Sequence, residues 1–181
     1  FLECRTMRAD RLLKEIGINA HYVLLNTKDE GLYKNIPPFI AFNHAIVAVE
    51  TSGEIQYLDL TAENYPIGSI PRIDKEAFSL LIRPDVKKPS YLRSNNLKKS
   101  SIIRNKTVNI KDDNCISVRI QTKRTYNLTA GFRDTYRLKS EDDRRKELTE
   151  VLSKEYPNVN LLNFKIENLD GIEPDLYYHY E

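Results

Sequence analysis

The feature of this sequence that most constrains its fold is a pair of strand-like segments joined by a very short turn. Residues 44–50 carry the apolar run Ala-Ile-Val-Ala-Val, and residues 54–59 form a second strand-like segment. Thr51-Ser52-Gly53 separates them, and a short loop that contains Gly is typical of a β-hairpin. The sequence therefore predicts two antiparallel strands whose ends away from the turn, near residues 44 and 59, lie side by side.

The outer ends of this hairpin carry two chemically active side chains. Counting outward from a turn centred near Ser52 places Asp59 opposite roughly Ala45, which is the neighbour of His44. A carboxylate beside an imidazole orients the ring and fixes its tautomer. We therefore expect His44 and Asp59 to interact at the open end of the hairpin.

A helix, a strand and a loop precede the hairpin. The helix is expected over residues 6–16 and should end at Gly17, because the residue after a helix often needs a positive φ. Its apolar positions are Leu12, Leu13 and Ile16. Residues 21–27 predict a buried strand, and residues 28–41 a loop rich in breakers. Cys4 lies just before the predicted helix, where the helix dipole favours a thiolate.

Cys4, His44 and Asp59 are, in this order, the residue types of a thiol acyl-transfer site. The thiolate attacks a carbonyl carbon, the imidazole takes the thiol proton, and the carboxylate orients the imidazole. This set suits attack on a carboxamide or peptide carbonyl, giving a thioester that water or an amine resolves. Asn43 is a further candidate for substrate contact, with a purely structural role in a turn as the alternative.

These motifs resemble the transglutaminase-like superfamily, and in particular a bacterial branch of it. The matching segments are residues 12–20, 23–27, 42–47 and 58–61. The resemblance implies an α+β fold in which residues 1–82 form part of a papain-like core with an antiparallel sheet. It implies a catalytic triad of Cys4, His44 and Asp59, and hence a cysteine-dependent acyltransferase or amidohydrolase that acts on peptide or side-chain amides.

The sequence also departs from the pattern of this family. Glu3 stands where the family usually has Asp, and Leu60 replaces the usual Pro. Cys4 precedes Gly17 by 13 positions instead of about 15, and two helical residues rotate a side chain by roughly 200°. These departures leave open a second hypothesis, in which the chain is an inactive transglutaminase-like scaffold that binds a protein or glycan partner.

The rest of the chain predicts a linker and a second domain. Residues 83–106 hold eight Lys or Arg against one acid, which predicts a basic linker, with binding to an anionic surface as a further hypothesis. Residues 107–181 predict a small α/β or β-rich module with one helix, and the related bacterial branch often carries such a module. Ser140 and Asp143 resemble a helix N-cap, and Cys115 beside a turn is expected to pack.

Composition argues against several functional classes. The 181 residues carry a net charge of +2, which gives no strong indication of nucleic acid, and no apolar stretch approaches the roughly 20 residues of a membrane span. Three His, two Cys and the lack of a CxxC motif argue against a structural zinc site. We expect a peptide or protein substrate, no nucleic-acid partner, no cofactor and no metal, and leave the oligomeric state open.

The start and origin of the chain allow two further expectations. Phe1 in place of Met indicates a fragment or a processed form of a longer protein. Many members of the family that the chain resembles are exported bacterial proteins, so the resemblance implies an extracytoplasmic location.

Overall fold

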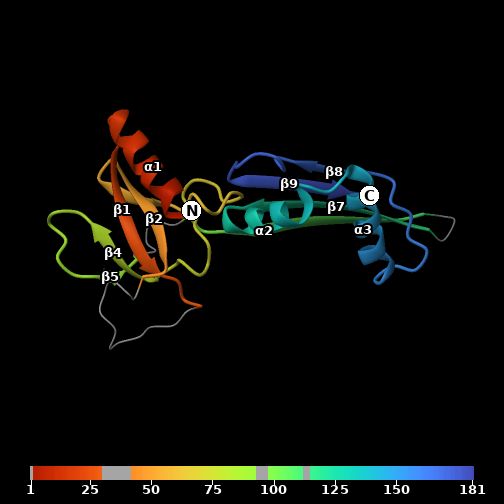
Figure 1. Cartoon of the computed structure of the whole chain (residues 1–181). Coiled ribbons are helices and arrows are strands. Elements are labelled where there is room, and N and C mark those ends of the chain that lie inside the picture. The colour runs from red at the N-terminus through yellow and green to blue at the C-terminus, as the bar shows by residue number, and fades with distance from the viewer. Residues whose placement is uncertain (1, 30–41, 93–97, 112–114) are drawn as a thin grey trace. The chain divides into compact units, whose positions relative to one another are not determined.

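The computed structural model describes residues 2–29, 42–92, 98–111 and 115–181, with side chains from Arg5 onward. In these ranges the chain is an α+β protein with helices and two antiparallel sheets, as expected from the sequence (Figure 1). It divides into two compact units, Phe1–Lys98 and Lys99–Glu181. Each unit has its own sheet, so each is described by itself.

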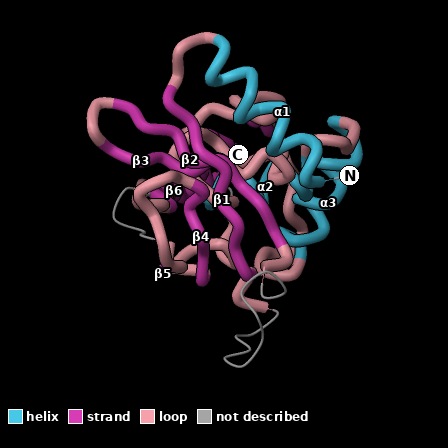
Figure 2. Tube along the Cα trace, turned by 60° about the vertical axis from the view of Figure 1, so that its left-hand side comes forward, coloured by secondary structure: helices cyan, strands magenta, loops and turns pink. Residues whose placement is uncertain are grey.

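The first unit is built from one helix and a five-stranded antiparallel sheet with the order β3-β2-β1-β4-β5 (Figure 2). Its elements are α1 (Leu2–Glu15), β1 (Asn19–Asn26), β2 (His44–Thr51), β3 (Glu54–Leu58), β4 (Phe78–Ile82) and β5 (Ser90–Tyr91). The helix begins at Leu2, four residues before the expected start, so Cys4 belongs to its first turn. The predicted loop 28–41 lies mostly outside the described residues.

Helix α1 ends where the sequence predicts. Gly17 has a φ of +81°, and the amides of Gly17 and Ile18 donate to the carbonyls of Lys14 and Leu13 at 3.0 and 2.9 Å. These two bonds form a Schellman motif, in which the left-handed residue is nearly always Gly. The turn sends the chain directly into β1.

The two faces of the first sheet pack against different partners. One face carries Ala20, Val47 and Val49, and it is covered by Ala9 and Leu13 of α1. The other face carries a larger cluster that includes residues from the loops after β3 and β5. Its buried members are Val23, Leu25, Ile46, Ala48, Ile70, Ala77 and Leu92.

The apolar side of α1 differs from the expectation. Leu12 and Ile16 are exposed, and only Leu13 of the three expected residues packs on the sheet. Thr6 completes the buried side, because it is fully buried and its hydroxyl donates to the Ala45 carbonyl at 3.1 Å. A threonine at a sheet-facing position is not detected by a search for apolar periodicity.

The hairpin forms as predicted, but its register differs by one residue. Ser52 and Gly53 both have positive φ, so the turn has two central residues and its centre falls between them. Val47 therefore pairs with Leu58, and the next step places Asp59 opposite Ile46 instead of Ala45. Since side chains alternate along a strand, this register puts Asp59 on the face that His44 and Ile46 share.

The second unit is a four-stranded antiparallel sheet with the order β6-β7-β9-β8, accompanied by two helices in its described residues. Its elements are β6 (Ile102–Ile110), β7 (Ile116–Thr125), α2 (Asn127–Tyr136), α3 (Glu141–Ser153), β8 (Phe164–Glu167) and β9 (Asp175–Tyr180). The sequence predicted one helix, which is α3, and its N-cap is confirmed because Ser140 accepts from the Asp143 amide. Cys115, expected to pack, is exposed.

Helix α2 was not predicted from the sequence. Its Phe132 and Tyr136 pack against the core of the second unit, but its most deeply buried residues include two polar ones. The residues that it buries are Thr129, Ala130 and Arg133. The Arg133 guanidinium is fully buried and donates to the Thr129 hydroxyl and to the carbonyls of Asn168 and Glu173. The helix is thus fixed to the loop between β8 and β9 by hydrogen bonds as well as by packing.

The segment expected to be a basic linker, residues 83–106, contains regular structure. It holds β5 and residues 102–106 of β6, and Leu92 within it belongs to the core of the first unit. The two units divide between Lys98 and Lys99. Strand β6 begins earlier than expected because its full length pairs with β7, from Ile102 opposite Arg124 to Ile110 opposite Ile116.

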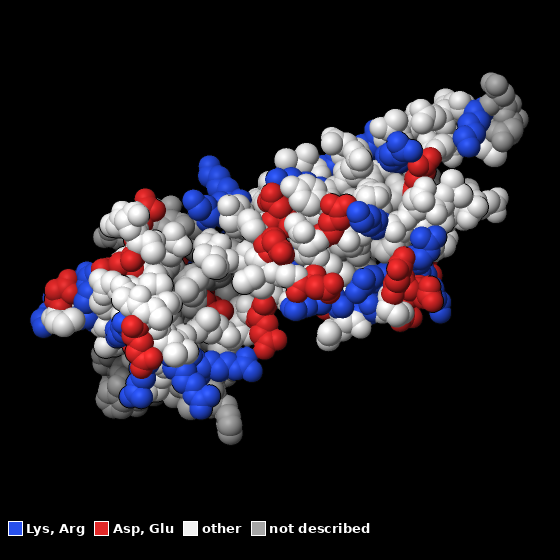
Figure 3. Space-filling model, turned by 90° about the horizontal axis from the view of Figure 1, so that it is seen from above, with Lys and Arg blue, Asp and Glu red and all other residues white. Residues whose placement is uncertain are grey.

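On the face shown in Figure 3, acidic and basic side chains are interspersed within each unit and do not gather into one patch of a single sign. Among the helices that the structure describes, none is both long enough and apolar enough to cross a membrane.

Candidate functional site

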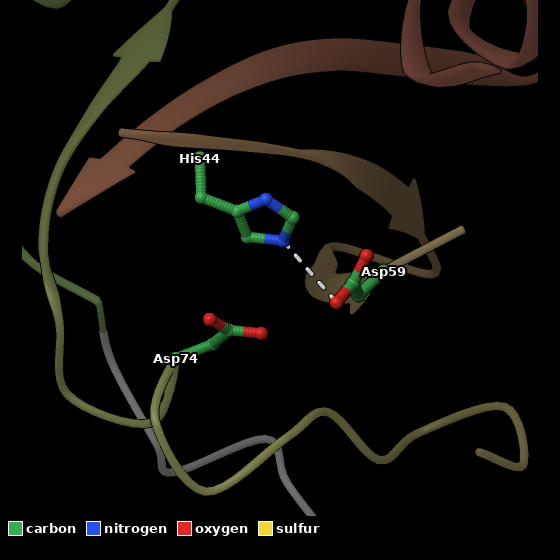
Figure 4. Close-up of side chains that lie close together, drawn as sticks. All are labelled: His44, Asp59 and Asp74. Carbon is green, nitrogen blue, oxygen red and sulfur yellow. Dashed lines mark ion pairs between the residues drawn. The ribbon is translucent and has the colours of Figure 1, made fainter. Parts of the chain in front are cut away.

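The structure brings His44 and Asp59 together at one end of the first sheet. His44 is the first residue of β2, and Asp59 directly follows β3. The Nε2 atom of His44 lies 3.2 Å from Oδ2 of Asp59 (Figure 4). Both side chains are largely buried, with 14% and 3% of their surface exposed. His44 and Asp59 therefore interact at the open end of the hairpin, as the sequence predicts.

The second oxygen of Asp59 is held by its own loop. Oδ1 accepts from the Thr61 amide at 2.9 Å and from the Thr61 hydroxyl at 2.7 Å. This is an Asx-type turn, which fixes the carboxylate relative to the backbone. Because Thr61 holds Oδ1, Oδ2 is free to face the imidazole of His44. Both the carboxylate of Asp59 and the donors of Thr61 come from the motif Tyr57-Leu58-Asp59-Leu60-Thr61.

The two groups stabilise each other's charged forms. The hydrogen bond to Asp59 raises the pKa of His44 above its ordinary value, although burial opposes this, and the charges of Asp59 and Asp74 add to it. Burial by itself would raise the pKa of Asp59, but the hydrogen bonds from His44 and Thr61 outweigh it and lower that pKa. An ionised carboxylate beside an imidazole that readily takes a proton is the state that a general base requires.

A third residue, Asp74, completes this cluster and was not predicted from the sequence. It lies in the loop between β3 and β4, where its amide donates to the Pro71 carbonyl and its own carbonyl accepts from the Ala77 amide. One side-chain atom from each of His44, Asp59 and Asp74 lies within 4.8 Å of the other two. Figure 4 shows the Asp74 carboxyl directed toward the other two side chains.

Asp74 is an unusual group to bury. Its side chain has no exposed surface, and neither carboxyl oxygen has a hydrogen-bond partner among the described residues. Burial, followed by the negative charge of Asp59, raises the pKa of Asp74 to about 7. Displaced pKa values of this kind gather at functional sites. No sequence motif marks Asp74, since only the folded loop brings it beside His44.

Asn43 has a structural role in this arrangement. Its side-chain amide donates to the Thr27 hydroxyl at 2.7 Å, and its side-chain oxygen accepts from the Thr27 amide at 2.9 Å. The Asn43 amide also donates to the Leu25 carbonyl. These bonds tie the end of β1 to the start of β2 and so hold His44 in place, while both ends of the Asn43 side chain are engaged.

The start of α1 lies at the same end of the sheet as His44 and Asp59. Thr6 bonds to the carbonyl of Ala45, the residue after His44, and Arg5 forms an ion pair with Glu63 at 3.0 Å. Cys4 directly precedes Arg5 in the first turn of α1. The Cys4 side chain lies outside the described part of the structure, so the predicted triad is described for two of its three members.

The cluster also has the donor types of a metal site. His44 offers a ring nitrogen, and Asp59 and Asp74 each offer a carboxylate oxygen. Zn²⁺ is bound by this mixture of nitrogen and oxygen donors. Three protein ligands with an open fourth position are typical of catalytic zinc sites, whereas structural sites usually have four protein ligands.

The second unit has an open pocket of about 500 Å³. It is lined by residues of β7, β8 and β9 together with the chain end, among them Arg119, Lys165, His179 and Glu181. Glu181 accepts from the Arg119 guanidinium at 2.8 Å and from the Ser117 hydroxyl at 3.1 Å. The lining mixes polar and apolar side chains, and its Glu181 carboxylate is engaged by Arg119 and Ser117.

Comparison of the chain with protein-family models, with curated proteins and with solved structures gives no match. Function is therefore inferred from the chemistry of the site.

Proposed function

We propose that this chain is a transglutaminase-like cysteine acyltransferase or amidohydrolase, built on part of a papain-like core. Its substrate is a peptide or side-chain amide, and the reaction passes through a thioester on Cys4. The observation that carries this proposal is the buried pair of His44 and Asp59, whose Nε2 and Oδ2 atoms lie 3.2 Å apart. This pair sits at the sheet end where α1 begins, on the Ile46 face, whereas α1 covers the opposite face of the sheet.

In the proposed reaction each nitrogen of His44 has a distinct task. Asp59 accepts the Nε2 hydrogen, so the neutral ring keeps its lone pair on Nδ1. Nδ1 takes the proton of the Cys4 thiol, and the thiolate attacks the amide carbon. The C–N bond breaks as the imidazolium returns its proton to the leaving nitrogen, which leaves the thioester. Water or a primary amine then attacks the thioester, with His44 as base, and releases an acid or a new amide.

Two contacts hold the beginning of α1 at this end of the sheet, which supports a role for Cys4. The Thr6 hydroxyl bonds beside His44, and Arg5 pairs with Glu63 in the loop that follows Asp59. A residue in the first turn of a helix experiences the positive end of its dipole, which favours a thiolate. Cys4 has this position in the chain, whereas Cys115 is exposed in the second unit.

The test uses a Cys115→Ser chain, so that Cys4 is its only thiol. A glutamine-containing protein is offered with a fluorescent primary amine, and both amine incorporation and ammonia release are measured. We expect turnover in the Cys115→Ser chain, none after Cys4→Ala, and nearly none after His44→Ala. Turnover that survives Cys4→Ala at the parent rate would rule the proposal out.

A second candidate function is an inactive scaffold with the same core. The observation that favours it is the regularity of α1, which is helical from Leu2 with Thr6, Ala9 and Leu13 toward the sheet. In a regular helix, two missing residues between Cys4 and Gly17 rotate the side chain at position 4 by roughly 200°. The Cys4 thiol would then face away from His44. A scaffold would show an ordinary Cys4 thiol and no turnover, and it would bind a protein or glycan whether or not Cys4 is replaced by Ala.

A further inference from the structure

We propose that His44, Asp59 and Asp74 bind a divalent transition-metal ion, Zn²⁺ in particular, and that occupancy of this site switches off the chemistry of Cys4. The binding part stands on the described side chains alone. The inhibitory part rests on the proposed function, and the experiments below separate the two.

The spacing of the donors suits a small cation. Zn²⁺ lies about 2.0–2.2 Å from nitrogen and oxygen ligands, so two ligands on one tetrahedron are about 3.4 Å apart. The His44 Nε2 and Asp59 Oδ2 atoms are already 3.2 Å apart. One donor atom from each of the three side chains, including an oxygen of Asp74, lies within 4.8 Å of the other two. A modest movement of the Asp74 side chain completes a three-ligand site with a fourth position open to water.

Asp74 is the independent sign that this cluster is built for a cation. Its side chain is fully buried, no described group donates to either oxygen, and it is directed at His44 and Asp59 (Figure 4). A buried carboxylate without a donor is costly, and buried charges are ordinarily paired or bound to a metal. A cation bound by all three side chains would give the Asp74 carboxylate the direct positive contact that no group in the described ranges donates to it.

The loop around Asp74 is fixed well enough to present it. Backbone bonds link Pro71 to Asp74 and Asp74 to Ala77, and the Ile73 carbonyl accepts from the Lys28 amide at 3.0 Å. Asp59 is fixed by Thr61, and His44 begins a strand that Asn43 ties to β1. Each ligand therefore comes from a different segment, and each segment is held by its own hydrogen bonds.

Metal binding and base catalysis exclude each other at His44. A metal on Nε2 takes the lone pair of that nitrogen, so the ring hydrogen moves to Nδ1. Nδ1 is the atom that must accept the Cys4 proton in the proposed reaction, and with a hydrogen in place it cannot. Asp59 is withdrawn from the imidazole at the same time. Zn²⁺ thus acts as a reversible inhibitor without any redox step.

Binding is tested on the 181-residue chain with Cys4→Ser and Cys115→Ser, because free thiols also bind Zn²⁺. Titration with Zn²⁺ in competition with a chelator, and with Co²⁺ followed by visible absorption, gives stoichiometry, affinity and coordination. We expect one ion per chain. Asp74→Asn should weaken binding about 100-fold or more, since changes even in the outer shell of a metal site cost about 10–100-fold.

Glu76→Gln is the matched control for this titration, because Glu76 lies two residues away in the same loop with an exposed side chain. It should bind Zn²⁺ like the parent, and His44→Gln should repeat the loss seen with Asp74→Asn. Stoichiometric binding that is equal in the parent and in folded Asp74→Asn would overturn the site. So would the failure of the folded parent to bind Zn²⁺.

Inhibition is tested on the Cys115→Ser chain by the rate at which iodoacetamide alkylates Cys4. Zn²⁺ should slow alkylation in this chain, and Asp74→Asn should abolish the effect. If Zn²⁺ binds through Asp74 but leaves the alkylation rate unchanged, the switch is overturned while the metal site stands. Protection that persists in Asp74→Asn would show that Zn²⁺ acts on the thiol directly.

Discussion

The two units of this chain each bury a charged side chain, and they treat it in opposite ways. In the second unit, Arg133 is fully buried and donates to Thr129 at 2.8 Å, to Asn168 at 2.9 Å and to Glu173 at 2.8 Å. In the first unit, Asp74 is equally buried, yet neither of its oxygens has a hydrogen-bond partner among the described residues. The two side chains are therefore equally buried but differ in their hydrogen bonds: Arg133 has several described partners and Asp74 has none.

This difference separates a structural role from a functional one. A buried polar group with all its bonds made fixes one conformation, and Arg133 does this for the loop between β8 and β9. The buried Asp74 carboxyl has no described hydrogen-bond donor and lies beside His44 and a second carboxylate, so it readily binds a proton or a cation. We therefore propose that the Arg133 cluster stabilises the fold and that the cluster of His44, Asp59 and Asp74 carries the chemistry.

Replacement of Asp59 by Asn should have the largest effect on this comparison. The hydrogen bond that fixes the His44 tautomer would be lost or reversed, and turnover should fall by about 10⁴-fold while the fold persists. The measurement is the rate of amine incorporation at saturating substrate. Asp85→Asn is the control, because Asp85 is exposed and pairs with Arg83, and it should keep the parent rate. An Asp59→Asn enzyme within a few fold of the parent would contradict the assigned role.

Replacement of Arg133 by Met should cost stability and leave the thiol chemistry intact. The carbonyls of Asn168 and Glu173 would lose their donor, and the second unit should lose about 3 kcal/mol of unfolding free energy. Urea unfolding gives this value, with Arg119→Met as an exposed control that stays within about 0.5 kcal/mol. Lost turnover in folded Arg133→Met would show that the two clusters are not separate in function.

Replacement of Asp74 by Asn should make the chain more stable at high pH. Folding raises the pKa of Asp74 to about 7, so the folded state holds a proton that the unfolded state releases near pH ~4. The parent therefore loses stability as the pH rises from about 4 through 7, and Asp74→Asn does not. At pH 8 the variant should gain roughly 4 kcal/mol, about 1.4 kcal/mol for each of the three pH units between the two pKa values, and near pH 4 the gain should vanish. Denaturant unfolding with a chelator present measures this, and a gain independent of pH would contradict the raised pKa.

Replacement of Ser140 by Ala should give the smallest of these effects. Ser140 accepts from the Asp143 amide at 3.1 Å and caps α3, so its loss should cost about 1 kcal/mol in the second unit. Thermal unfolding of this unit reports the change, and Ser153→Ala near the other end of the same helix is the control. No change in turnover is expected, since the cap touches neither cluster.

The parts that could be predicted from the sequence are those governed by local rules. Gly17 marks the end of α1, Ser140 marks the start of α3, and Ser52-Gly53 marks the hairpin turn. The meeting of His44 with Asp59 also follows from the hairpin. The predicted register was wrong by one residue. The prediction centred the turn on Ser52, whereas the centre lies between Ser52 and Gly53, which moves the partner of Asp59 from Ala45 to Ile46.

The parts that could not be predicted depend on burial of polar groups. Helix α2 buries Arg133 beside its core-packed Phe132 and Tyr136, and α1 uses Thr6 where a search expects an aliphatic residue. Asp74 reaches His44 through a loop with no recognisable motif. The expectation that no metal is bound relied on the spacing of Cys and His, and such a search does not detect carboxylates that come together only in three dimensions.

The most direct test of the account is the pH dependence of Cys4 alkylation in the Cys115→Ser chain, with and without His44→Ala. If the imidazole activates the thiol, Cys4 should react as a thiolate well below the ordinary thiol pKa of about 8.5, and His44→Ala should shift its profile up toward that value. A profile with an ordinary pKa in both chains would contradict the proposed ion pair and leave the scaffold as the better reading of this fold.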